Sequence, residues 1–86
     1  MNKITRYVIK MKNGTYMKTE FDEVVPSQVK VLEVDHPVDA DLHRDKETAE
    51  RIIKEIATTT TFLPVIYNKE NPPEEVQEMK IGVEIR

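Results

Sequence analysis

The sequence predicts an α+β domain in which one amphipathic helix packs on one face of an antiparallel sheet of about five strands. Three observations lead to this prediction: an Asn-Gly turn between two strand-like segments, a single helix-periodic stretch mid-chain, and an alternating segment near the C-terminus. The 86 residues suffice for one domain, so we expect residues 1–86 to fold as a unit. The expected order is β-hairpin, strand, helix, strand, strand, which buries the apolar faces economically.

Residues 4–21 predict a β-hairpin that turns at Asn13-Gly14. The apolar pattern favours a three-residue loop over 12–14, which pairs Met11 with Thr15 and gives Gly14 a left-handed conformation. This register also predicts the pairs Ile9–Met17 and Tyr7–Thr19. The expected inner face of the hairpin consists of Tyr7, Ile9, Met11, Met17 and Phe21. The expected outer face consists of Arg6, Val8, Lys10, Tyr16, Lys18 and Glu20.

The remaining elements follow from changes in periodicity. Residues 28–34 predict a third strand, and a loop with four aspartates follows over 35–45. Apolar residues at helical spacing predict a helix over about 46–57, with Asp45 as its N-cap. Residues 61–67 predict a strand, in which Pro64 favours a sheet edge or a bulge. A polar loop is expected over 68–75, and a last strand follows with Met79, Ile81, Val83 and Ile85 facing inward.

Composition excludes several classes of protein. No apolar run approaches the roughly 18–20 residues of a membrane-spanning helix. The chain has no cysteine, so disulfide and thiolate chemistry are ruled out. The N-terminal charges are not followed by an apolar signal core, and we therefore expect a cytoplasmic protein.

Catalysis and cofactor binding are not expected. Asp35-His36 and His43 could form an acid–base pair, but the chain has one serine and no other evident nucleophile to work with them. Two glycines cannot build a phosphate-binding loop. Asp39, Asp41 and Glu50 have the spacing of calcium ligands, yet Arg44 stands where a calcium loop needs glycine. We predict no enzyme, metal site or cofactor, and leave cation binding by the acidic loop open.

Two acidic segments are the candidate protein-interaction surface. The first is the loop over 35–45, and the second follows Pro72-Pro73 over about 72–78. Their carboxylates could occupy a basic cleft of a partner that handles nucleic acid. The candidate residues are Asp35, Asp39, Asp41, Asp45, Glu74, Glu75 and Glu78.

Two alternatives use other features. The outer face of the hairpin could bind nucleic acid, with an aromatic side chain stacking on a base, although the net charge of −3 disfavours this. A purely structural subunit could instead self-associate as a homodimer through an edge strand, for which residues 79–85 are the candidate template. The nucleic-acid candidates are Arg6, Lys10, Lys12, Tyr16 and Lys18.

Two segments resemble a family of small proteins. Residues 7–18 read Tyr-Val-Ile-Lys-Met-Lys-Asn-Gly-Thr-Tyr-Met-Lys, and residues 45–50, which lead the helix, read Asp-Lys-Glu-Thr-Ala-Glu. This combination resembles small accessory proteins of bacteriophages and prophages over about a third of the chain. The resemblance implies a protein that binds and inhibits or modulates a host or defence protein, such as a nuclease, in the host cytoplasm.

Overall fold

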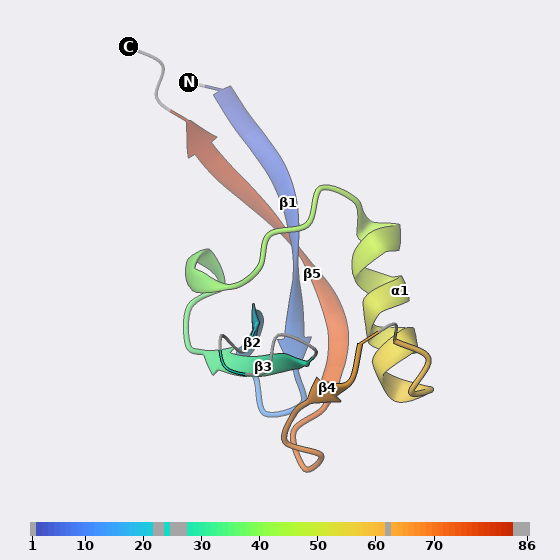
Figure 1. The fold of residues 1–86 in the computed structure, drawn as a ribbon. Coiled ribbons are helices and arrows are strands. Elements are labelled where there is room, and N and C mark those ends of the chain that lie inside the picture. Colours follow the sequence, from blue (N-terminus) through green and yellow to red (C-terminus); the bar gives the residue numbers. More distant parts are fainter. Residues whose placement is uncertain (1, 22–23, 25–27, 62, 84–86) are drawn as a thin grey trace.

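The computed structural model describes residues 2–21, 24, 28–61 and 63–83, which form a five-stranded sheet with one α-helix (Figure 1). The strands are β1 (Asn2–Met11), β2 (Tyr16–Phe21), β3 (Val29–Val34), β4 (Val65–Ile66) and β5 (Pro73–Val83), and the helices are α1 (Lys46–Ala57) and the short 3-10 helix η1 (Pro37–Asp39). The sheet order is β4-β3-β2-β1-β5, and every neighbouring pair is antiparallel except β3–β4. Helix α1 packs against β1 and β5, which confirms the predicted α+β class.

The hairpin turn has the predicted register. Lys10 lies opposite Tyr16, and the Met11 N–H donates to the Thr15 carbonyl at 2.7 Å. Gly14 has a φ of +93°, a left-handed conformation that the three-residue loop requires and that residues with a side chain rarely adopt. Local turn chemistry therefore decides the register at this end of the hairpin.

Beyond the turn the two hairpin strands separate, and the segment 40–43 bonds to both of them. Tyr7 exchanges backbone hydrogen bonds with His43, each at 2.8 Å. The Asp41 carboxylate accepts hydrogen bonds from the N–H and the hydroxyl of Thr19, at 2.8 and 2.5 Å. The Asp41 N–H also donates to the Met17 carbonyl at 3.1 Å. The predicted Ile9–Met17 and Tyr7–Thr19 pairs are therefore wrong, because a distant loop supplies the partners that a continuous hairpin would have provided.

The long β1–β5 pair corrects the predicted faces of β5. Met79 lies opposite Arg6, and Val76 lies opposite Ile9. Directly opposed residues project to the same face and successive residues alternate, so Met79 and Ile81 lie on the face opposite that of Ile9. The prediction that they share its core is wrong, because alternation does not say which face meets the helix. The side chains of Val83 and Ile85 fall outside the described part of the chain.

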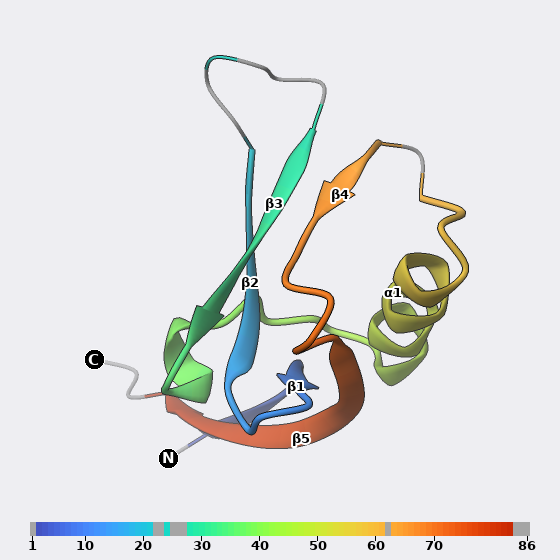
Figure 2. The same ribbon diagram turned by 90° about the horizontal axis from the view of Figure 1, so that it is seen from below.

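The core lies between α1 and one face of the sheet, and its composition corrects two further assignments. Val8, expected to face outward, is 0% exposed, whereas Phe21, expected to face inward, is 63% exposed. Figures 1 and 2 show α1 on one side of β1 and the segment with η1 on the other, so both sides of β1 are covered near its centre. The buried core residues are Ile9, Met11, Met17, Ala49 and Ile56.

Helix α1 has the predicted bounds. Asp45 occupies the N-cap position with an extended backbone, but its side chain makes no capping hydrogen bond. No helix among the described residues is long and apolar enough to cross a membrane.

The last two strands differ in length from the prediction. Instead of spanning 61–67, β4 contains only Val65–Ile66, at the sheet edge that Pro64 predicted. The polar loop predicted over 68–75 ends early, because β5 already begins at Pro73. The reason is non-local: β1 pairs with β5 along its whole length, and this ladder overrides the weak strand propensity of the acidic residues.

The β1–β5 pair also extends past the body of the molecule as a two-stranded arm (Figure 1). We define the arm as residues 2–6 of β1 and 79–83 of β5. Asn2 and Val83 lie opposite each other at its tip, and the molecule measures 41 Å along its longest axis against 27 and 22 Å across.

Candidate functional site

Strand β5 forms one edge of the sheet, so one side of its backbone has no neighbouring strand within the described residues. Tyr7 bonds to His43 on the side of β1 that faces away from β5. Because hydrogen-bonded pairs alternate along an antiparallel ladder, Glu78, which lies opposite Tyr7, points its own N–H and C=O outward. The same alternation directs outward the backbone groups of four residues, which we call the outer edge of β5: Val76, Glu78, Lys80 and Gly82.

The outer edge carries two opposite charges, Glu78 and Lys80. The Lys80 ammonium lies 3.2 Å from the Glu78 carboxylate and donates a hydrogen bond to the Thr5 hydroxyl at 2.7 Å. Both charged side chains remain more than half exposed, so this ion pair contributes at most about 1 kcal/mol to folding. The two charges therefore remain accessible to a neighbouring molecule.

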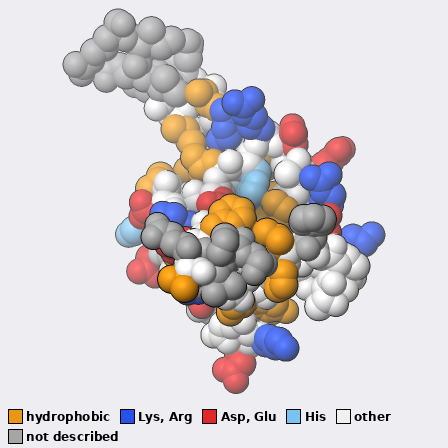
Figure 3. All heavy atoms as spheres, in the orientation of Figure 1, with side chains coloured by type: hydrophobic (Ala, Val, Ile, Leu, Met, Phe, Trp, Pro, Cys, Tyr) orange, Lys and Arg blue, Asp and Glu red, His pale blue; other side chains and the backbone are white. Residues whose placement is uncertain are grey.

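Apolar side chains accompany this edge on the other face of the arm. Ile4 lies opposite Ile81 and is 37% exposed, while Met79 and Ile81 are half-buried. Figure 3 shows hydrophobic side chains along the arm beside basic ones. The arm thus combines unpaired backbone, accessible charges and partly exposed apolar groups in one narrow element.

The predicted acidic residues do not form two neighbouring loops. Asp41 is bonded to Thr19 and helps to position its own loop. Glu75 lies in β5, 3.9 Å from the Lys10 ammonium, instead of in a loop. Among the described residues, no three His, Cys, Asp or Glu side chains lie close enough to hold a metal ion. The remaining candidates are exposed: Asp35 before η1, Asp39 in η1, Asp45 before α1, and Glu74 and Glu78 in β5.

The basic candidates lie on the face that the hairpin register predicted, but several have partners. Lys10 pairs with Glu75, and the Tyr16 hydroxyl donates to the Gln77 side chain at 3.3 Å. Tyr16 is therefore held against β5 rather than fully presented for base stacking. The other three candidates are Arg6, which is half-buried, and Lys12 and Lys18, which are exposed.

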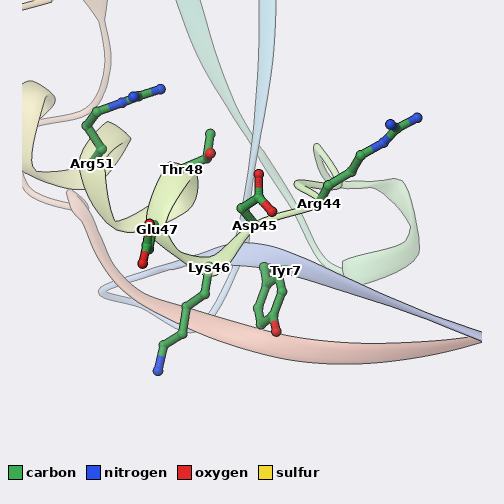
Figure 4. Close-up of a pocket in the computed structure, with 7 residues that line it drawn as sticks. All are labelled: Tyr7, Arg44, Asp45, Lys46, Glu47, Thr48 and Arg51. Carbon is green, nitrogen blue, oxygen red and sulfur yellow. The ribbon is translucent and has the colours of Figure 1, made fainter.

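A polar hollow of about 580 Å³ lies at the start of α1 (Figure 4). Figure 4 shows its charged side chains pointing in different directions instead of converging on one point. No sequence motif predicts a site at this hollow. Its lining residues are Tyr7, Arg44, Asp45, Lys46, Glu47, Thr48 and Arg51.

An apolar groove of about 300 Å³ runs between α1 and strands β2 to β4. Phe21 and Leu63 border it, and the exposure of Phe21 follows from this open position.

Comparison of the chain with protein-family models, with curated proteins and with solved structures finds no match.

The sequence pattern predicts residues 79–85 as a template for pairing but does not reveal the members of the outer edge at residues 76 and 78. The polar residues before 76 were predicted to form a loop, and Glu78 was predicted to be a loop carboxylate. One sequence signal was present: Lys80 interrupts an apolar run, and natural sheets place lysine on exposed edge strands.

Proposed function

We propose that this chain is a small, non-enzymatic protein-interaction module that binds its partner by strand addition along the outer edge of β5. The main support is the run of outward-pointing backbone groups from residue 76 to residue 82, in a strand whose other side is fully paired with β1. An extended segment placed beside this edge would become a sixth strand, and main-chain hydrogen bonds would supply much of the affinity.

The charges of the edge would give orientation to such binding. Glu78 is one of the acidic interaction residues expected from the sequence, and it lies at the middle of the outer edge next to Lys80. Exposed charges of this kind chiefly affect association rate and register. A cytoplasmic host or defence protein, as the phage resemblance implies, is one partner class that this proposal allows.

Proline at position 78 tests the proposal. The Glu78 N–H points outward, so a proline there would remove an edge donor and place its ring in the path of an added strand without breaking a bond to β1. The immobilised chain is used to capture proteins from a nuclease-treated bacterial lysate. The Glu78→Pro variant should no longer retain the proteins that the unmodified chain retains. The matched control is Glu78→Ala, which removes the same carboxylate and keeps the N–H.

The comparison is read by mass spectrometry on chains whose circular dichroism matches that of the unmodified protein. Retention by Glu78→Ala and loss with Glu78→Pro would support strand addition. Equal retention by all three chains would place the binding surface elsewhere. Loss of all capture after nuclease treatment would favour the basic face of the hairpin and nucleic acid.

A further inference from the structure

We infer that the strand added to the outer edge of β5 is β5 of a second copy, antiparallel to the first, with a two-fold axis passing beside Met79. This inference rests on the proposed function and names the partner class: another molecule of the same chain. A two-fold axis makes the two sides of such an interface identical, so the edge must be complementary to itself.

The charges of β5 favour this centre over its neighbours. An axis at Glu78 would oppose two glutamates, and an axis at Lys80 would oppose two lysines, each a destabilising cross-strand pair. An axis at Met79 instead places Glu78 opposite the partner's Lys80, twice by symmetry. The outward backbone groups also match, because Glu78 and the partner's Lys80 form a hydrogen-bonded pair in this register.

The existing ion pair fits into this arrangement without being broken. Glu78 and Lys80 already lie 3.2 Å apart within one chain. Adding the partner's two charges gives four charges of alternating sign, each next to two of opposite sign. Lysine on an edge strand ordinarily discourages pairing, but here it meets a glutamate.

The shape of the arm supports the same partner. In the antiparallel pair, residues 80–83 of one arm would run beside residues 75–78 of the other copy, where β5 joins the body (Figure 1). Met79 would meet the partner's Met79, and Ile81 would lie opposite the partner's Gln77. The dimer would have one continuous ten-stranded sheet, and the β5 edges would no longer be exposed.

Charge reversal with mixing tests both the dimer and its register. In a dimer of the Glu78→Lys chain, position 78 of each copy and the opposing position 80 of the other both carry lysine. In a dimer of the Lys80→Glu chain, both of these positions carry glutamate. Each variant should therefore dimerise about tenfold more weakly than the unmodified chain. An equal mixture of the two variants should dimerise again, because every position 78 then faces an opposite charge at position 80. Sedimentation equilibrium over a range of concentrations measures this against the 10.0 kDa mass of one chain.

The outcomes separate this inference from the proposed function. A concentration-dependent dimer that is weakened in each variant and restored in the mixture supports the inference. A dimer insensitive to these charges overturns the register, and a monomer at all concentrations overturns the second-copy partner. If the monomeric chain still captures another protein in a way that Glu78→Pro abolishes, the proposed function stands and only this inference fails. Glu78→Pro provides a second test that involves no charge reversal, since it should also be monomeric.

Discussion

Replacing Ile9 with alanine is expected to lower the free energy of unfolding by about 3 kcal/mol. Ile9 is 1% exposed, and it packs in the cluster that joins β1 to α1 through Ala49 and Ile56. Shortening this side chain loses its burial and leaves a cavity that strands paired on both sides cannot easily close. Urea unfolding followed by circular dichroism measures the change.

Phe21→Ala is the control, because the sequence pattern assigned Phe21 to the same inner face as Ile9. The structure leaves Phe21 63% exposed, so its replacement should cost less than about 1 kcal/mol. A similar loss of stability at both positions would contradict the observed difference in burial between the two side chains.

Replacing Asn71 with alanine is expected to cost about 2 kcal/mol, although the residue is polar and lies in a loop. Asn71 is 4% exposed, and its carbonyl oxygen accepts a hydrogen bond from the Asn13 N–H at 2.7 Å. Its amide nitrogen donates to the Glu33 carboxylate and, at 3.4 Å, to the Thr15 hydroxyl. One side chain thus ties the hairpin turn to the loop before β5, and alanine would remove these bonds and leave the partly buried Asn13 N–H without its partner.

Asn68→Ala is the matched control in the same loop. Asn68 is exposed, and its side chain accepts a single hydrogen bond, from the Glu70 N–H at 3.0 Å. Its loss should cost about 0.5 kcal/mol, since water can replace that bond. Thermal unfolding of both variants measures the difference. An equal fall of the two unfolding midpoints would contradict the assigned role of Asn71.

Local elements were predictable because neighbouring residues determine them. The φ of Gly14 and the Lys10–Tyr16 pair follow from the length and composition of one turn. The bounds of α1 follow from a single apolar stripe that begins after Asp45. The turn and the helix are therefore each determined by a few adjacent residues.

Long-range pairing accounts for the corrections. The sequence near Tyr7 does not show that His43 will bond to it. The sequence near Pro73 does not show that pairing with the long strand β1 will extend β5 across the acidic residues. The candidate site depends on the same information. The sequence identifies Glu78 as a candidate interaction residue by its charge. It does not show that the Glu78 backbone points outward, because an edge is a property of the order of strands in the sheet.

The amide hydrogen exchange of β5, measured residue by residue at low and at high protein concentration, tests the central claim most directly. In dilute solution, Gln77 and Met79 should be protected by β1, while Glu78 and Lys80 should exchange rapidly. At high concentration, Glu78 and Lys80 should become protected, with little change at Gln77 and Met79. Equal protection of all four amides at every concentration, or fast exchange of Glu78 and Lys80 throughout, would contradict a free edge that pairs with a second copy.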